Sequence, residues 1–255
     1  MIKVLNRWWR IVATGGCFFI FGVGGLLLSL FIFPSIELLP LNTRLKREKV
    51  QNIIQKSFRL FIWLMEILGV LRVEIEGLEE LSPLKSQIVI ANHPTLIDVI
   101  ILMAYLENAN CIVKQKLLLN PFLMGIVKSA GYIGNSDPQE LIDDCLTAIN
   151  NGNILIVFPE GTRTTPGQAI RFQRGAANLA LRSGQDIKPV IITCNSLSLT
   201  KEKSWYQVPS EGRVIIRLKF GETIAANSFI YGAKSMSVAS RQMTEYLQNY
   251  YQKEI

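Results

Sequence analysis

The sequence predicts an α/β fold with a mainly parallel central sheet flanked by helices, preceded by an N-terminal two-helix membrane hairpin. After Leu71, short apolar runs alternate with stretches of helical periodicity, which is typical of a mainly parallel, covered sheet. Before Leu71, Ile11–Phe33 contains no charged residue, and most of the hydrophobic excess behind the mean hydropathy of +0.26 lies in this part of the chain. We therefore expect membrane-associated helices in residues 1–71 and an α/β domain in residues 72–255.

The first predicted helix, Ile11–Phe33, would be roughly 34 Å long, which is enough to cross or deeply enter a bilayer. Cationic and aromatic residues suited to anchoring at the membrane interface precede it: Lys3, Arg7, Trp8, Trp9 and Arg10. The apolar run is too long for a cleavable signal peptide, and no small-residue cleavage site follows it.

The second predicted helix, Gln51–Leu71, is amphipathic. Its polar side chains fall on one helical stripe, made of Asn52, Gln55, Lys56, Arg59 and Glu66. Such a helix either lies in the headgroup region of a membrane or packs on the domain as a core helix. Positive charge flanks Ile11–Phe33 on both sides, in part from Arg44–Lys49, so we expect the two helices to form a hairpin that dips into one leaflet.

The α/β domain contains apolar or alternating runs that predict strands at Arg72–Glu76, Gln87–Ala91, Cys111–Val113, Ile154–Phe158, Pro189–Cys194 and Val214–Phe220. Helices are expected between them and after them at Thr95–Glu107, Leu117–Ser129, Gln139–Asn150, Gln173–Ser183 and Val238–Gln252.

The net charge of +7 favours an anionic membrane surface as a partner over nucleic acid, because no basic-aromatic nucleic-acid motif accompanies it. The four cysteines are widely spaced and sit in apolar surroundings, so we expect buried free thiols in a reducing compartment. No cluster with metal-ligand spacing is visible, and a metal is therefore not expected.

The only histidine of the chain, His93, directly follows the predicted strand Gln87–Ala91, and Asp98 comes five residues later. With Pro94 as the first residue of the next helix, the Asp98 carboxylate could fold back to the imidazole. An aspartate that holds the imidazole leaves the other ring nitrogen free to take a proton from a hydroxyl. The structural alternative is a histidine that merely caps the helix, with Asp98 on its surface.

A second polar turn, Phe158–Thr164, follows the apolar strand that begins at Ile154. It presents the carboxylate of Glu160 and the guanidinium of Arg163, which suits forked binding of a phosphate. Gly161 lets a ligand approach the backbone closely. Since ligands bind at the carboxyl ends of parallel strands, this turn and the His93/Asp98 element together favour a catalytic site.

These residues resemble the glycerolipid acyltransferases of the 1-acylglycerol-3-phosphate acyltransferase type. Asn92–Asp98 is similar to the first sequence block of that family, Phe158–Thr164 to its third, and Lys188–Ile191 to its short fourth block. The resemblance covers roughly residues 71 to 219. It implies a glycerolipid acyltransferase-like fold and transfer of a fatty acyl group from a thioester, acyl carrier protein or coenzyme A, to a lipid hydroxyl.

In that family pattern His93 is the general base and Asp98 its orienting partner. Glu160, Gly161, Thr162 and Arg163 bind the polar end of the acceptor, and Arg174 lies in a stretch that often follows the third block. No covalent acyl-enzyme is implied, because the chain has no G-x-S-x-G elbow and no cysteine near the motif in sequence.

The second block of the family departs from the pattern. It ends in an arginine that helps to bind the acceptor phosphate, whereas Gly131–Asp137 places Asp137 at that position. Asp137 instead reads as the N-cap of the helix that follows, with Glu140 three residues on. Lys128, Arg171 and Arg174 are the candidate substitutes.

The expected protein is thus a membrane-bound acyltransferase at the bacterial inner membrane, with its active site on the cytoplasmic face and with membrane lipids as partners. The first acceptor candidate is 1-acyl-sn-glycerol-3-phosphate or another lysophospholipid. One alternative is a phosphate-free hydroxylated lipid, such as a hydroxy-fatty-acyl, aminolipid or polyene lipid. The alternative from another class is a non-catalytic lipid-binding protein with the same fold. Apart from the acyl donor, acyl-CoA or acyl carrier protein, no cofactor is expected.

Overall fold

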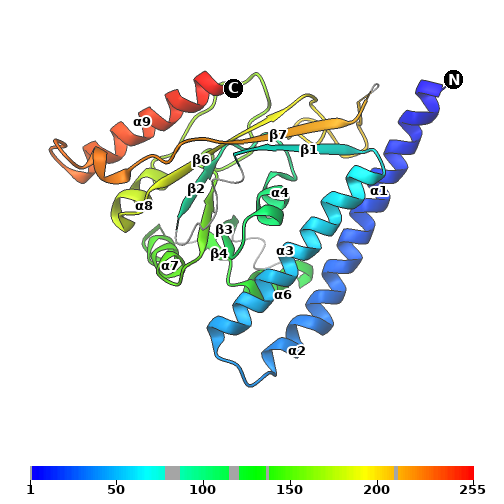
Figure 1. Ribbon diagram of the computed structural model, residues 1–255, viewed down its shortest axis with the longest axis horizontal. Helices are drawn as coiled ribbons and strands as arrows, with labels where there is room; N and C mark the ends of the chain where they lie inside the picture. Colours follow the sequence, from blue (N-terminus) through cyan, green and yellow to red (C-terminus); the bar gives the residue numbers. More distant parts are fainter. Residues whose placement is uncertain (1, 78–86, 115–120, 136–137, 210–211) are drawn as a thin grey trace.

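The computed structural model describes residues 2–77, 87–114, 121–135, 138–209 and 212–255 (Figure 1). Seven strands of this part form one sheet in the order β1-β7-β6-β2-β5-β3-β4. Their bounds are β1 Leu71–Glu76, β2 Ile88–Ala91, β3 Ala109–Lys114, β4 Ile133–Asn135, β5 Ile154–Val157, β6 Ile187–Cys194 and β7 Val214–Phe220. All neighbouring strands are parallel except β6 and β7, which confirms the mainly parallel sheet.

Helices cover both faces of the sheet, as the alternation of side chains along β2 shows. Val89 and Ala91 belong to a core shared with α4 (Asp98–Tyr105) and with the N-terminal helices. Ile88 and Ile90 point to the other face, where the core includes residues of α7, α8 and α9. The helices on that face are α7 Pro138–Asn150, α8 Gly175–Ser183 and α9 Met236–Glu254, with the short 3₁₀ helix η3 at Ala226–Phe229. Burial of β2 on both faces explains why its sequence is apolar throughout.

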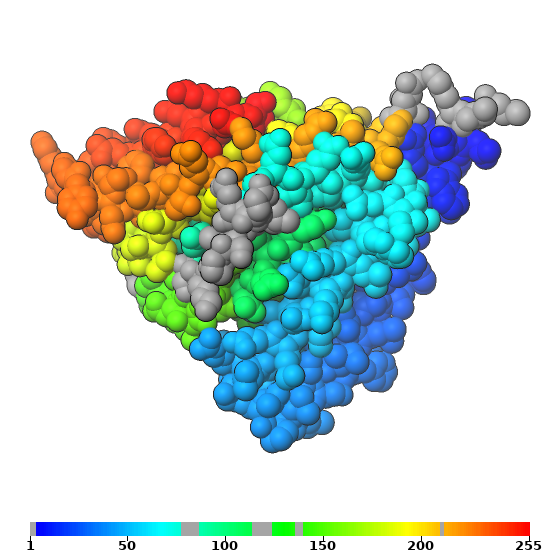
Figure 2. Space-filling view, viewed as in Figure 1, coloured from blue at the N-terminus to red at the C-terminus, as the bar shows by residue number. Residues whose placement is uncertain are grey.

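The N-terminal segment forms two antiparallel helical arms along one flank of the molecule (Figures 1 and 2). The first arm consists of α1 Ile2–Leu27, the π-helical turn η1 Leu28–Ile32 and α2 Phe33–Glu37. The Asn42 side chain caps α3 (Thr43–Ile67) by accepting the Leu45 N–H at 2.9 Å. Within the described residues, Val4–Glu37 is the one helix long and apolar enough to cross a membrane. The expected two-helix arrangement is therefore present, and its insertion into a membrane stays a prediction.

The N-terminal helices share the core of the α/β domain. Cys17 of α1 and Met65 of α3 are fully buried in the same cluster as Val89 and Ile101. Helix α6 (Pro121–Ala130) packs against the first arm so closely that a Cβ on Gly125 would lie 2.2 Å from Ser29 Oγ. Residues 1–71 are therefore packed as part of the same body as the sheet.

Helix α3 packs its apolar face on the domain, as the core-helix alternative predicted: Phe61, Ile62 and Met65 are buried, whereas Asn52, Lys56 and Arg59 of the polar stripe are exposed. Some polar side chains beside this contact also bond to the domain. Arg59 Nε donates to the Ala104 carbonyl at 2.7 Å, and Glu66 Oε1 accepts the Val73 N–H at 2.9 Å. Gln51, which is buried, donates from Nε2 to the Ala130 carbonyl at 3.0 Å. Large apolar residues also lie on the outward side of this helix, namely Leu60, Trp63 and Ile67, which are 60%, 55% and 61% exposed.

Other differences from the predicted elements are local. The helix predicted at Thr95–Glu107 begins only at Asp98, and Pro94 is not its first residue. The residues before Asp98 form a turn instead, because His93 and Thr95 bond to its carboxylate. The helix expected at Leu117–Ser129 is observed as α6 from Pro121, and residues 115–120 lie outside the described part of the chain. Strand β4 is three residues long, too short for a periodic pattern, and was not predicted.

Candidate active site

The first and third motifs meet because β2 and β5 are neighbours in the sheet. Asn92 and His93 follow the carboxyl end of β2, and the turn Phe158–Thr164 follows the carboxyl end of β5. Strand β6, on the other side of β2, ends at Cys194 and leads into a loop that also reaches the site. This is the edge of a parallel sheet at which ligands bind.

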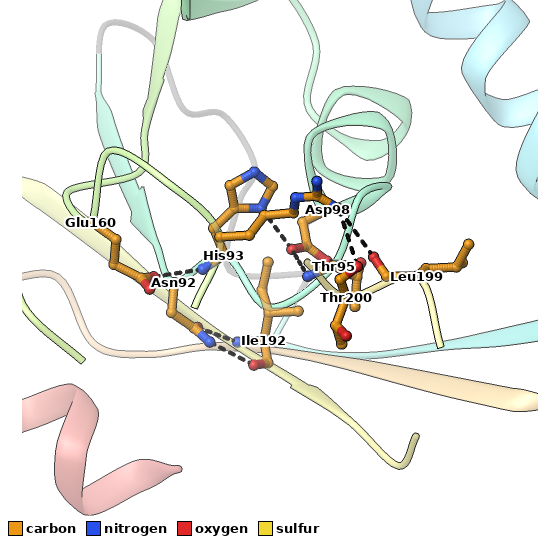
Figure 3. A network of polar contacts seen from close by, with 9 residues as sticks. Asn92, His93, Thr95, Asp98, Glu160, Ile192, Leu199 and Thr200 are labelled. Atoms are coloured by element: carbon orange, nitrogen blue, oxygen red, sulfur yellow. Dashed lines mark hydrogen bonds and ion pairs between the residues drawn. The ribbon is translucent and has the colours of Figure 1, made fainter. Parts of the chain in front are cut away.

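Two side chains hold β2 in place just before His93. Asn92, which is buried, donates to the Ile192 carbonyl and accepts the Ile192 N–H, both at 2.7 Å (Figure 3). Tyr251 of α9 donates its hydroxyl proton to the Ile90 carbonyl at 2.5 Å and accepts the Val190 N–H at 3.1 Å. Neither contact was predicted from the sequence.

Tyr251 bridges β2 and β6 next to Pro189, which lies opposite Ile90 in the register of the two strands. The Pro189 carbonyl faces β7, where it accepts the Gly221 N–H at 2.9 Å, so the Val190 N–H is the donor of β6 nearest the Ile90 carbonyl. The fully buried Tyr251 hydroxyl lies between these two groups as both acceptor and donor. This bridge was invisible in the sequence because Ile90, Val190 and Tyr251 lie far apart along the chain.

His93 and Asp98 form a close pair at the centre of the site. His93 Nδ1 lies 2.8 Å from Asp98 Oδ2, and the Asp98 side chain is fully buried. An ionised carboxylate can only accept, so Nδ1 carries the proton and donates it. Figure 3 shows the other ring nitrogen pointing away from Asp98. The expected pairing of these two residues is thus present in the structure.

Thr95 fixes the Asp98 carboxylate from the opposite side. Its N–H donates to Oδ2 at 2.6 Å, and its hydroxyl donates to Oδ1. The bond from the Thr95 N–H to the carboxylate of Asp98, three residues later in the chain, has the spacing of a capping box. Burial raises the pKa of Asp98, while the hydrogen bonds from His93 and Thr95 oppose that rise by stabilising the anion. Asp98 is therefore held in one orientation, facing the imidazole.

The backbone of His93 is bonded on both sides to the turn after β5. Glu160 Oε1 accepts the His93 N–H at 2.7 Å, and the His93 carbonyl accepts the Thr164 N–H at 3.0 Å. The Phe158 ring packs against the imidazole with 4.4 Å between ring centroids. Glu160 is buried, which raises its pKa, and its Oε2 has no hydrogen-bond partner in the described residues. Glu160 thus positions His93 in this structure.

The remaining residues of the turn differ in exposure. Gly161 has φ = +67°, and a Cβ there would lie 2.7 Å from Gln173 Nε2, so the turn needs glycine. Thr162 is exposed. Arg163 is half-buried, and its Nη1 lies 3.4 Å from the carbonyl oxygens of both Leu199 and Thr200.

The loop after β6 contributes backbone to the site. The Leu199 carbonyl accepts the Leu96 N–H at 2.8 Å. It also accepts the bond from Arg163 (Figure 3). Leu199 has φ = +64°, which is unusual for a residue other than glycine. Further along, Trp205 lies over α1, where a Cβ on Gly15 would be 3.1 Å from its ring. Sequence analysis gave no indication of this loop.

The proposed phosphate-binding substitutes lie apart from this network. Lys128 on α6 and Arg171 are exposed, and Arg174 is exposed at the start of α8. Asp137, the residue in place of the second-block arginine, lies outside the described residues. Arg163 is therefore the cation that the described residues place beside the His93 cluster.

The cysteines offer no activated nucleophile. Burial raises the pKa of Cys111 and of Cys145 to about 12, and it also raises the pKa of Cys194. Cys194, the half-buried one of these, donates its thiol proton to the Ser196 carbonyl at 3.0 Å. The described residues contain no group of three or more metal-binding side chains.

Comparison with known proteins gives three findings. A family model described as Acyltransferase matches residues 72–193. The 1-acyl-sn-glycerol-3-phosphate acyltransferase of Pseudomonas aeruginosa is 28% identical over 199 residues, which make up 74% of this chain and 72% of that protein. The protein of the same name from Limnanthes alba is 32% identical over 149 residues, or 56% of this chain and 51% of its own length.

Among solved structures, the crystal structure of the 1-acyl-sn-glycerophosphate acyltransferase from Thermotoga maritima matches with a TM-score of 0.73 and covers 97% of both chains. At 20% identity, this match concerns the fold alone. It includes the N-terminal helices as well as the sheet, because so little of either chain is left out.

Proposed function

Because this chain belongs to the glycerolipid acyltransferase family, as the sequence predicted, we propose that it transfers a fatty acyl group from a thioester to the hydroxyl of 1-acyl-sn-glycerol-3-phosphate. The prediction of an acyltransferase is confirmed at the level of the family. The acceptor follows from relatives that are named for it. The donor, coenzyme A or acyl carrier protein, is part of the proposal.

The observation that carries the proposal is the His93/Asp98 pair, with 2.8 Å between Nδ1 and Oδ2 and with Asp98 fully buried. Asp98 keeps the proton on Nδ1, so the other ring nitrogen is the one that accepts. When the acceptor hydroxyl binds there, His93 removes its proton as the oxygen attacks the thioester carbonyl carbon. The buried Asp98 anion stabilises the imidazolium that forms.

The step balances without an acyl-enzyme. Attack by the acceptor oxygen forms the new C–O bond and a tetrahedral intermediate, whose collapse breaks the C–S bond. The thiolate that leaves takes the proton from the imidazolium, so His93 returns to its neutral state. A direct transfer agrees with the raised pKa of the Cys194 thiol, because a protonated, half-buried thiol is a poor nucleophile.

Arg163 supplies positive charge for the acceptor phosphate. Two carbonyl oxygens hold its Nη1 at 3.4 Å, which orients the guanidinium. Its remaining donors suit forked binding of a phosphate. Gly161 and the exposed Thr162 lie in the same turn and would contact the same headgroup.

The N-terminal helices bring the site to the lipid. Large apolar side chains point outward on both arms, among them Phe19 at 71% and Leu60 at 60% exposure. Many exposed large apolar side chains on neighbouring helices are rare on soluble monomers and are typical of membrane contact. In a bacterial cell, the membrane would be the inner one with the site on the cytoplasmic face, where soluble thioester donors occur.

The test uses full-length protein in lipid or detergent, with release of the thiol as readout. The His93→Ala variant should lose about 10²–10⁴-fold in kcat, the usual contribution of a general base. Its unfolding transition and its membrane association should match the wild type. Turnover close to wild type in His93→Ala would exclude His93 as the base, and no turnover by the wild-type protein with any donor would favour the non-catalytic lipid-binding alternative.

An acceptor screen with a labelled acyl thioester separates the two enzymatic alternatives. Lysophosphatidic acid should be acylated much faster than phosphate-free hydroxylated lipids, because Arg163 makes charge-assisted bonds only to the former. Arg163→Gln should raise KM for lysophosphatidic acid and leave KM for a phosphate-free lipid unchanged. Turnover restricted to phosphate-free lipids would replace the proposed acceptor by the alternative one.

A further inference from the structure

A basic pocket lies between α8 and the start of α9, outside the His93 cluster. Its volume is about 370 Å³, and it is lined by Arg174, Asn178, Arg182, Met236, Ser237 and Ser240. No acidic side chain is among these lining residues. Ligand pockets have volumes of roughly 300–1,000 Å³, so this pocket suits a small polar group rather than a whole lipid or nucleotide.

The α8 side of the pocket is a row of polar residues spaced four apart, Arg174, Asn178 and Arg182. Arg182 is in the last turn of α8, where a cation is favourable. Arg174 occupies the N-cap position, where a cation is unfavourable and where its side chain makes no capping bond. Helix stability therefore does not account for Arg174, whereas an anion in the pocket would.

The α9 side presents the amino end of a helix. Ser235 caps α9 by accepting the Val238 N–H at 3.3 Å, and no acidic residue occupies the first turn. Met236 and Ser237 line the pocket from that turn. The first N–H groups of a helix have no partner within it, and together with the helix dipole they attract anions.

Ser240 is an independent indication that the pocket receives a ligand. Its side chain is 1% exposed and lines the pocket, yet its hydroxyl has no hydrogen-bond partner in the described residues. Buried hydroxyls are almost always bonded, because leaving one unpaired is unfavourable. A bound oxyanion would supply the missing acceptor.

We propose that this pocket binds the phosphate group of a soluble phosphate ester. Two guanidinium groups, helix N–H groups and the Ser237 and Ser240 hydroxyls provide the many donors that a phosphate with several oxygens can accept. A solution ligand fits the location, because α8 and the beginning of α9 lie at the end of the molecule opposite α1 and α3 (Figure 1). A lipid headgroup would require this end to contact the membrane as well.

The experiment measures thermal unfolding of the full chain against rising inorganic phosphate, with chloride matched for ionic strength and acetate as a monovalent oxyanion control. Wild-type protein should gain stability with phosphate as expected for a ligand that binds only the folded state. In Arg182→Gln the phosphate dissociation constant should rise about tenfold or more, since a charge-assisted bond is lost. The matched control is Arg241→Gln, an exposed arginine one residue beyond Ser240 that does not line the pocket.

Ser240→Ala provides a second test, in which the stability of the phosphate-free protein and the affinity for phosphate should not fall together. Removing an unpaired buried hydroxyl should leave the phosphate-free protein as stable as wild type or more stable, while weakening phosphate binding. A purely structural role for Ser240 would instead lower stability at every phosphate concentration by the same amount.

The outcomes are distinct from those for the acyl transfer. His93→Ala should bind phosphate as the wild type does, so loss of catalysis leaves this test intact. An equal phosphate response in wild type and Arg182→Gln, or an equal response to acetate, would overturn the phosphate site. Stabilisation by phosphatidic acid vesicles over phosphatidylcholine vesicles, without any by inorganic phosphate, would overturn the assignment to a soluble ester.

Discussion

Replacing Asp98 by asparagine tests the role of the buried carboxylate most directly. In the wild type Oδ2 accepts from both Thr95 N–H and His93 Nδ1, while Oδ1 accepts the Thr95 hydroxyl. The amide oxygen of asparagine can keep the place of Oδ2. Its NH₂ group then meets the Thr95 hydroxyl, which can accept by turning its own proton. The shape of the site should therefore survive and its charge should not.

The expected loss is in kcat. Asp98 is fully buried and lies 2.8 Å from the imidazole, so water does not screen the attraction between the anion and the imidazolium. The corresponding change in serine protease triads lowers kcat by about 10⁴-fold. We expect about 10³–10⁴-fold here, which corresponds to about 4–5.5 kcal/mol of transition-state stabilisation. KM should change little, because Asp98 does not face the lipid.

The assay compares initial rates of thiol release over a range of lysophosphatidic acid concentrations, together with thermal unfolding of each variant. Asp144→Asn, at an exposed position of α7, is the matched control and should behave as the wild type. A kcat within about tenfold of wild type in folded Asp98→Asn protein would refute the reasoning, because it would place the bonded carboxylate outside the catalytic step.

Three further predictions concern the fold and the membrane. Tyr251→Phe should lower the free energy of unfolding by about 2–5 kcal/mol in denaturant titrations, because it leaves the Ile90 carbonyl and the Val190 N–H buried without their partner. Burial raises the pKa of Glu160 above its usual 4.5, so the folded state holds this proton more tightly than the unfolded chain does. The free energy of unfolding should therefore fall as the pH rises from 4.5 through the raised pKa of the folded state. Glu160→Gln should flatten that slope in unfolding measurements made across this pH range, while its amide oxygen still accepts the same backbone N–H. In membranes, single cysteines placed on the two sides of Ile11–Phe33 should react with an impermeant thiol reagent added to the same face.

Each of these has its own contrary result. Tyr250→Phe is the control for the first, because its ring is only half-buried beside Tyr251, and equal losses in the two variants would contradict the role of the Tyr251 hydroxyl. A pH profile unchanged by Glu160→Gln would assign the slope to another group. Labelling of the two flanks from opposite faces would replace the hairpin by a helix that crosses the bilayer.

The sequence was sufficient for most strands of the sheet and for the His93/Asp98 pair because both depend on local patterns. Apolar runs such as Ile154–Val157 predict buried strands, and a strand followed by Asn92–Asp98 predicts a site at its end. The spacing of His93 and Asp98 is likewise a local property. Their contact follows once the turn between them closes.

Contacts between distant segments could not be predicted in the same way. The bridge that Tyr251 makes between Ile90 and Val190 depends on the register of β2 and β6 and on the packing of α9. Periodicity separated the polar and apolar faces of α3, but it could not predict that Arg59 and Glu66 bond to the domain while Leu60, Trp63 and Ile67 stay exposed.

The packing of helix α3 on the domain determines what can be removed from this protein. A truncation that starts at β1, made to obtain a soluble enzyme, would take away Met65 and Phe61 from the core and the donor that Arg59 provides to Ala104. The remaining sheet would expose an apolar surface on the face that α4 shares, and it would aggregate rather than dissolve. Solubility would have to come from the outward residues Leu60, Trp63 and Ile67, whose replacement by polar side chains leaves every inward contact in place.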